Sequence, residues 1–406
     1  MNYRKFKADH LFTGKEMLGS DNILIIKKNG KIEEIINEKN AGDDIEIFKG
    51  IITPGFVNAH CHLELSHMKA LIPEKTGLID FVFKVVNDRH FPEEEILDAI
   101  EKTEEEMLQN GIIAVGDICN NDLTLQQKLK KRLSYYNFIE ASGWLPSVCK
   151  TRFERALDVY NEFNKQLATG NRQSATNNRQ LTTPNSIVPH APYSVSKELW
   201  ECIAPYFENK VVSIHNQETS FEDELFLQGT GEFLKMYKMM NIDNAHHQPT
   251  KKSSLQTYFS NLSKAASVIL VHNTFTKQTD IDYIKENKSE WQLISFCLCV
   301  NANIYIENTV PPIEMLMLND CNIVLGTDSI ASNWSLNILD EIKTIQKKIP
   351  NVSLEKMLQW ATFNGAKALL MDDLGSFEKG KTPGVVLIEN VVGLQLKKNS
   401  ASKRIL

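Results

Sequence analysis

Two histidines one residue apart end an early apolar run in this 406-residue chain. The run begins at Ile51, passes Phe56 and ends in His60, Cys61 and His62. In a β-strand, alternate side chains share a face, so His60 and His62 point the same way and Cys61 points the other. Two imidazoles on one face can provide two ligands for one transition metal. The alternative is a pair of histidines that only pack or form hydrogen bonds.

Later apolar segments also end in polar side chains. Adding His215 and Asp328 to the histidine pair gives three imidazoles and one carboxylate, a set that leaves a coordination position for water, as in catalytic zinc sites. A bound metal lowers the pKa of water toward ~7 and so provides hydroxide at neutral pH. The other strand-end residues are Asp117, Glu140, His190 and His272, of which Asp117 and Glu140 could instead be ordinary helix caps.

Glu218 stands three residues after His215. There a carboxylate can lie close to the metal without binding it, take a proton from water and pass it to a leaving nitrogen. The alternative is that Glu218 only begins the next helix, where a carboxylate favours the N-terminal dipole. We assign His272 as an electrostatic and hydrogen-bonding partner of the reacting water rather than as a firm ligand. The expected catalytic residues are therefore Glu218, His272 and Asp328.

Glu64 and Ser66 follow the histidine pair by two and four residues. Strand alternation would carry both along the same face, toward a substrate. Glu64 could instead brace the loop at residues 71–83, and His190 could be a buried histidine satisfied by the backbone. The residues expected to bind substrate are Glu64, Ser66, His190, Asn303 and Ser329.

Eight apolar segments of strand length carry these residues, with helical patterns between them. This alternation predicts an α/β fold, a (β/α)₈ TIM barrel, whose catalytic groups lie at the C-terminal ends of the strands. The fourth segment ends in Pro189 and His190 and offers no lysine to bridge two metals. We therefore expect one divalent transition metal per chain, with zinc favoured over iron. The strands are expected in the opening run and at residues 112–117, 135–140, 187–190, 211–215, 268–272, 292–297 and 322–328.

Both ends of the chain are rich in strand patterns. Residues 22–26 and 31–36 form a predicted hairpin, and residues 385–388 a predicted strand near the C-terminus. We expect residues 1–53 and 375–406 to pair into one small composite β-sandwich domain, with the hydrolase barrel at residues 54–374. Two polar segments, 164–185 and 241–252, are predicted surface loops. The second contains His246 and His247, which are adjacent and cannot share a strand face, so we expect them to face solvent.

The composition excludes several classes of protein. A net charge of -6 without a concentrated basic stretch argues against a nucleic-acid partner. No apolar run approaches the ~20 residues that span a bilayer, and the first residues lack the apolar core of a signal peptide. The seven cysteines form no CxxC pair, and Cys297 and Cys299 are expected to be small packed residues. We expect a cytoplasmic protein, a homodimer, that binds a small molecule and neither nucleic acid nor membrane.

Taken together, the motifs resemble the amidohydrolase superfamily, in its mononuclear deaminase and chlorohydrolase-like branch. Within it, residues 62–66 and 329–336 look most like aminodeoxyfutalosine deaminases, followed by adenosylhomocysteine deaminases. Val300 stands where a proline is expected after the seventh strand, in a loop that helps to shape the substrate pocket. The resemblance is carried by residues 54–64 (PGFVNAHCHLE), 190–196 (HAPYSVS), 215–219 (HNQET), His272, 326–329 (GTDS) and 380–384 (GKTPG).

This resemblance implies a metal-dependent hydrolase, commonly of amino groups on purine, pyrimidine or related rings. Our leading hypothesis is hydrolytic deamination of an aminated purine-type nucleoside or base, in which metal-bound hydroxide attacks the amino-bearing ring carbon. Glu218 would protonate the ring nitrogen and then the amine, and ammonia would leave. One alternative keeps the site but cleaves a cyclic amide or a carbon–halogen bond. Another is a barrel without activity that serves as a scaffold, against which the intact ligand set counts.

Overall fold

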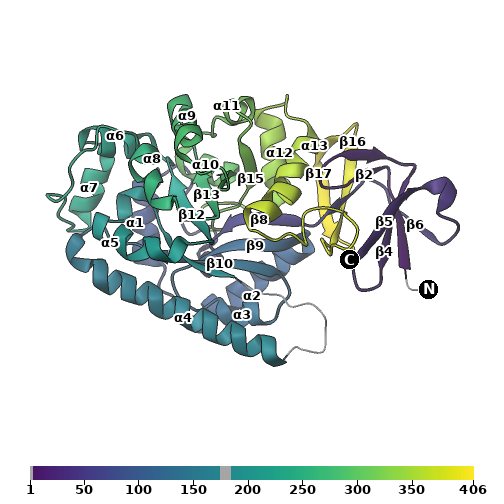
Figure 1. Ribbon diagram of the computed structural model, residues 1–406, viewed down its shortest axis with the longest axis horizontal. Coiled ribbons are helices and arrows are strands. Elements are labelled where there is room, and N and C mark those ends of the chain that lie inside the picture. The colour runs from purple at the N-terminus through teal and green to yellow at the C-terminus, as the bar shows by residue number, and fades with distance from the viewer. Residues whose placement is uncertain (1–2, 174–183) are drawn as a thin grey trace.

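The computed structural model describes residues 3–173 and 184–406 and contains a parallel barrel at its centre (Figure 1). The strands form two parallel sheets, in the orders β11-β10-β9-β8 and β12-β13-β14-β15. Their side chains are almost all buried, as expected for parallel strands with helices outside and packed side chains inside. The barrel strands are β8 (Phe56–Cys61), β9 (Ile112–Cys119), β10 (Ser134–Ala141), β11 (Asn185–Pro189), β12 (Val211–Asn216), β13 (Ser267–His272), β14 (Leu293–Leu298) and β15 (Asn322–Leu325).

Hydrogen bonds at two seams close the sheets into a barrel. At one seam, Thr327 and Asp328 donate their backbone amides to the His60 carbonyl at 3.0 and 3.1 Å. At the other, the His215 amide donates to the His190 carbonyl at 3.0 Å. Both seams therefore run through strand ends that carry candidate site residues. The barrel predicted from the sequence is confirmed.

Helices surround the barrel, and the long helix α4 runs along its lower edge in Figure 1. A short 3₁₀ helix, Leu63–Met68, follows β8 directly. No helix in the described part of the chain is long and apolar enough to cross a bilayer. The α-helices are α1 (Leu78–Asp88), α2 (Glu93–Gln109), α3 (Leu125–Leu129), α4 (Cys149–Gln173), α5 (Lys197–Ile203), α6 (Ser220–Gln228), α7 (Glu232–Met239), α8 (Ser254–Tyr258), α9 (Gln278–Asn287), α10 (Val300–Glu307), α11 (Ile313–Leu318), α12 (Ile338–Lys348), α13 (Leu354–Gln359) and α14 (Gly365–Ala368).

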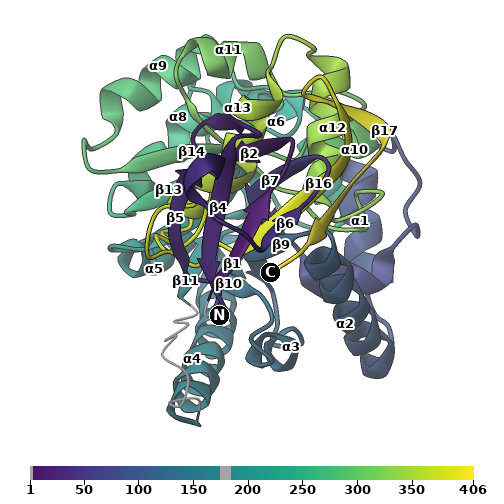
Figure 2. The same cartoon turned by 90° about the vertical axis from the view of Figure 1, so that its right-hand side faces the viewer.

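Strands from both chain ends pair beside the barrel, as predicted (Figure 2). One sheet has the order β5-β4-β1-β6, and the other has the order β17-β16-β7-β2-β3. Antiparallel pairing of Val385 with Pro54 and of Leu387 with Ile52 joins tail to head, and Phe6 helps to fill the shared core. The domain boundaries after residues 53 and 374 remain our proposal. These strands are β1 (Tyr3–Lys7), β2 (His10–Phe12), β3 (Met17–Gly19), β4 (Asn22–Lys27), β5 (Ile32–Asn37), β6 (Ile45–Ile47), β7 (Ile51–Pro54), β16 (Val385–Val392) and β17 (Gln395–Arg404).

The polar composition of residues 164–185 led to a wrong prediction. Helix α4 continues to Gln173, so the first ten residues of that segment are helical rather than looped. Phe163 is fully buried on this helix, and the Asn164 side chain accepts a hydrogen bond from Asn185 at the start of β11. Packing against the barrel therefore extends the helix through polar sequence. Residues 174–183 of the predicted loop lie outside the described residues.

Other predictions need smaller changes. One of the helical patterns expected between the strands, at residues 221–240, forms two helices, α6 and α7, because Gly229 and Gly231 take left-handed backbone conformations with φ of 72° and 99°. Residues 241–252 form a loop without helix or strand, as predicted. His246 is exposed, whereas His247 is half-buried and donates from Nε2 to the Leu225 carbonyl at 3.1 Å.

Candidate active site

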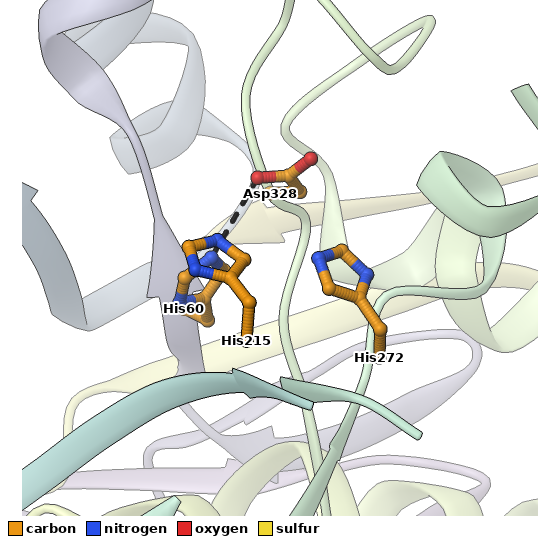
Figure 3. A group of neighbouring side chains, drawn as sticks. All are labelled: His60, His215, His272 and Asp328. Carbon is orange, nitrogen blue, oxygen red and sulfur yellow. Dashed lines mark ion pairs between the residues drawn. The ribbon is translucent and has the colours of Figure 1, made fainter. Parts of the chain in front are cut away.

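Four side chains predicted as metal ligands converge at the C-terminal end of the barrel. The Nε2 atom of His62 lies 3.2 Å from that of His60 and 3.3 Å from that of His215. Asp328 Oδ1 lies 3.3 Å from His62 Nε2 and 3.6 Å from His60 Nε2. Figure 3 shows His60, His215 and Asp328 around one point, with the fourth ligand not drawn. Residues predicted at separate strand ends therefore lie together in the structure, and they come from the ends of β8, β12 and β15.

The backbone beneath this cluster is tightly packed. A side chain at Gly326 would meet Cys297 Sγ at 2.7 Å and His60 Cβ at 3.0 Å, so only glycine fits there. The Asn58 side chain donates to Thr327 Oγ1 at 2.7 Å and accepts from the Thr327 amide at 3.1 Å. These bonds fix the approach of Asp328 to the histidine pair.

The ligand atoms are also held by a surrounding layer of contacts. His215 Nδ1 donates to the His190 carbonyl at 2.8 Å, which leaves the lone pair on Nε2, facing the cluster. Ser332 Oγ donates to Asp328 Oδ2 at 2.5 Å and leaves Oδ1 to the histidines. His60 Nδ1 is the exception, because no hydrogen-bond partner is found for it in the described chain. Such outer contacts orient metal-binding side chains.

Burial sets the protonation of the cluster. It lowers the pKa of His62 to about 3 and the pKa of His215 well below its usual range, so both rings are neutral at physiological pH. Burial alone would raise the pKa of Asp328, but the hydrogen bond with His60 and the facing imidazoles lower it overall. Neutral imidazoles and an ionised carboxylate are the forms that bind a transition metal. The residues therefore fit one such ion.

His272 adds a fourth imidazole to the same region, on the opposite side from His60 in Figure 3. Its ligand atom lies within 4.8 Å of those of His60, His215 and Asp328. His272 and Asp328 have left-handed backbones, with φ of 74° and 57°, a strain often found at functional sites. His272 Nε2 lies 3.6 Å from Glu218 Oε1. Its assignment as a partner of the reacting water stays a prediction.

A second group, Glu140, His190 and His215, has the ligand types and proximity for another metal. Its geometry argues against one, because the His215 nitrogen on that side already donates to the His190 carbonyl. His190 Nδ1 is likewise engaged, at 2.7 Å from Ser194 Oγ. A single metal per chain stays our prediction.

Glu218 lies between β12 and α6. It precedes Thr219, whose side chain caps α6, so Glu218 is not the cap itself. Its side chain is 5% exposed, and burial raises its pKa well above the usual value, with the charges of Asp328 and Glu307 adding to the effect. Within the described residues its carboxylate lies 3.6 Å from His272, and no hydrogen bond offsets the effect of burial on its pKa. A carboxyl group in this state can hold a proton at neutral pH.

A cavity of about 700 Å³ opens from the cluster toward solvent. Glu218, His190 and Ser329 line it, as does Glu64, which accepts hydrogen bonds from Arg89 and Asn120. Two predicted substrate residues do not line it within the described chain, for a local reason in each case. Ser66 turns away in the 3₁₀ helix and donates to the Leu63 carbonyl at 2.6 Å, while Asn303 is buried in α10 and contacts His272.

Several residues of this region were missed or misread from the sequence. The alternative that Asp117 and Glu140 are helix caps is wrong, because Thr124 and Leu145 occupy the N-caps of the helices that follow their strands, and both carboxylates are buried at strand ends. Asp117 pairs with Lys128, which no motif had singled out. The signal for Asp117 was its place in the strand-end pattern. Lys128 gave none, because α3 is short and the pairing depends on the fold.

Comparisons with known proteins agree with this architecture. The chain is 26% identical over 422 residues to a 5'-deoxyadenosine deaminase of Methanococcus vannielii, covering 94% of this chain and 84% of that protein. Helicobacter pylori aminofutalosine deaminase in complex with methylthio-coformycin superposes with a TM-score of 0.76 at 21% identity, covering 99% and 100% of the two chains. A zinc-bound adenosine deaminase from Xanthomonas campestris gives a TM-score of 0.64 at 19% identity, covering 95% and 84%.

The two solved structures establish the barrel fold with its terminal sheets. A model of the amidohydrolase family matches residues 51–402, which include the whole barrel, β16 and most of β17. The chain therefore belongs to the amidohydrolase family and is a hydrolase that acts on carbon–nitrogen bonds.

Proposed function

We propose that this chain is a metal-dependent hydrolytic deaminase of a purine-type nucleoside, releasing ammonia from an amino-bearing ring carbon. The observation that carries the proposal is the position of Glu218, a buried carboxyl group beside the ligand cluster on the wall of the same cavity. The similarity to deaminases of 5'-deoxyadenosine, aminofutalosine and adenosine supports it.

His60, His62, His215 and Asp328 would hold the metal, with zinc favoured by the imidazole-rich donor set. When bound, the metal would supply Lewis acidity and lower the pKa of a water molecule toward ~7. Because His62, His215 and Asp328 line the cavity, a ring that enters can place its amino-bearing carbon beside the cluster.

The chain's own groups account for the proton transfers. Water adds to the ring carbon that bears the amine, and Glu218 accepts one proton from it and donates a proton to the ring nitrogen. Glu218 then transfers the second proton of that water to the amine, which leaves as ammonia while the ring carbon keeps a carbonyl oxygen. His272, 3.6 Å from Glu218, would form a hydrogen bond with the oxygen as charge develops on it.

The size of the cavity favours a nucleoside over a free base. Its volume of about 700 Å³ lies in the range of ~300–1,000 Å³ that suits drug-sized ligands. Beyond the cluster, apolar side chains of α1 and α7 line it, including Phe81, Val85 and Met236, as does Trp144. Trp144 stacks on Tyr237 at a centroid distance of 5.3 Å, which makes a flat aromatic wall. A sugar and its substituents would occupy this part of the cavity.

Ammonia release tests the proposal. Adenosine, 5'-deoxyadenosine and 5'-methylthioadenosine should be deaminated faster than adenine, guanine or cytidine by the metal-loaded enzyme. A hydantoin and a chlorotriazine, assayed in parallel, test cleavage of a cyclic amide or of a carbon–halogen bond at the same site. Turnover of either in place of every aminated ring would replace the proposal with that alternative. A protein that binds metal but turns over nothing on the panel would indicate a scaffold.

A further inference from the structure

Two oppositely charged side chains lie fully buried behind the His62 strand end. Lys128 on α3 and Asp117 on β9 are both 0% exposed, and Lys128 Nζ lies 2.5 Å from Asp117 Oδ2. Neither takes part in the proposed reaction. A buried ion pair loses the hydration of both charges, so burial of this pair calls for a structural explanation.

The second oxygen of Asp117 provides that explanation. Asp117 Oδ1 accepts a hydrogen bond from the Leu63 amide at 2.8 Å. The ladder between β8 and β9 ends where Cys61 pairs with Asp117. The backbone of Asp117 therefore pairs with the residue before His62, and its side chain holds the amide of the residue after it. His62 is fixed on both sides by one aspartate.

Lys128 in turn fixes the aspartate. Its ammonium group also donates to Cys119 Sγ at 3.1 Å and lies 5.1 and 5.2 Å from the ring centroids of Tyr135 and Phe163. Burial lowers the pKa of Lys128, but the interactions with Asp117 and Cys119 together outweigh it, and the pKa is raised overall. The lysine is therefore charged, and it is enclosed by partners that match the charge.

We propose that Asp117 is a positioning residue for the metal site: it holds the backbone of His62 in its ligating conformation through the Leu63 amide, while Lys128 balances the charge of the buried carboxylate. The inference rests on the metal assignment in the proposed function. The simpler alternative is that the pair only anchors α3 to the barrel.

Two double variants separate these roles. Asp117→Asn/Lys128→Met removes both charges but keeps an oxygen that can accept the Leu63 hydrogen bond. Asp117→Leu/Lys128→Met has nearly the same shape and lacks that acceptor. Both lose the α3 ion pair equally. Zinc affinity of each metal-free protein, measured by competition with a chromophoric chelator, is the readout, and thermal melts in EDTA report on folding.

The Asn/Met protein should bind zinc within a few-fold of wild type, and the Leu/Met protein roughly 10–100-fold more weakly, the usual range for outer contacts of a metal site. Equal zinc affinities of the two folded doubles would overturn the positioning role alone. A wild-type protein that binds no zinc would overturn the metal assignment as well. If the Leu/Met protein does not fold, Asp117→Ala/Lys128→Met replaces it, with the same loss expected.

Discussion

The ends of β8 and β12 both supply predicted metal ligands, yet the chain that follows each is held by different chemistry. After His62, the Leu63 amide is held by Asp117, whose charge is matched by Lys128. Two residues after His215, just beyond the end of β12, stands Gln217, a fully buried neutral amide with a left-handed backbone at φ 45°.

Gln217 is held on every side. Its side chain donates to Asp280 at 2.9 Å and to Asp223 at 3.2 Å, and accepts from Thr276 at 2.8 Å. Its backbone amide donates to Glu222 at 3.0 Å. It directly precedes Glu218, whose proton affinity is part of the proposed reaction. The backbone before Glu218 is thus fixed by a neutral side chain that bridges carboxylates of other elements, whereas the backbone after His62 is held directly by a charged side chain with a lysine partner.

The largest expected effect lies at the β8 end. His62→Ala should abolish both metal retention and activity, because it removes the nitrogen closest to the other ligand atoms. Elemental analysis should find about one metal per chain in the wild type and almost none in the variant. His246→Ala, which changes an exposed histidine outside the cluster, is the control and should keep its metal. Full metal content in the His62 variant would refute its role as a ligand.

The β12 end should separate chemistry from metal binding. Glu218→Gln should keep the metal and lose roughly 10²–10⁴-fold in kcat, since the amide cannot carry protons between water and the leaving amine. Steady-state kinetics and metal analysis on the same preparation measure both quantities. Loss of the metal would show that Glu218 is needed for metal binding, and full activity would show that it does not carry the protons. Either outcome would contradict the proposed roles of the two strand ends.

A third variant tests whether the side chain of Gln217 positions Glu218. Gln217→Leu should keep the metal and lower kcat roughly 10–100-fold, because a small displacement of a reacting group has effects of this size. Gln292→Leu is a matched control: Gln292 is also a buried glutamine, with two hydrogen bonds to Leu262 and Ala265 at the far end of β14.

Both substitutions should destabilise the protein by about 1–3 kcal/mol, because each leaves buried polar groups without a partner. Only the change at Gln217 should lower kcat. Equal kinetic losses in the two variants, once the folded fraction has been measured by thermal melts, would assign the effect to stability rather than to position.

The smallest effect is expected at Glu64, which lines the cavity next to the β8 end. Glu64→Gln should retain the metal and raise KM for a nucleoside several-fold, because it weakens the bonds to Arg89 and Asn120 that orient this wall. The variant should also discriminate less between nucleoside and free base. If the kinetic loss is the same for both substrates, Glu64 does not sense the sugar.

The sequence predicted the positions of site residues correctly where the alternation of side chains along a strand continued to the strand end. His60, His215 and Asp328 stand at or just past strand ends, and strand alternation with barrel topology is enough to bring them together. This alternation no longer applies where the strand is followed by a helix. The 3₁₀ helix that starts at Leu63 turns Ser66 away from the cavity, and the helix that starts at Val300 buries Asn303.

The ion pair of Asp117 with Lys128 shows a different limit. Its partners lie on different elements and are joined by packing that no local pattern encodes, so only the three-dimensional fold reveals it. The same holds for the unexpected length of α4, whose polar end is helical because the buried face that precedes it packs on the barrel.

The pairing of β7 with β16 has a consequence for synthesis of the chain. Pro54 emerges from the ribosome 331 residues before Val385, its partner in the sheet. Until then the β7 edge has unpaired backbone groups, the kind of edge that other strands can join. Completion of the terminal sheet must therefore wait until Val385 has emerged, and shorter nascent chains would be the species most prone to aggregate.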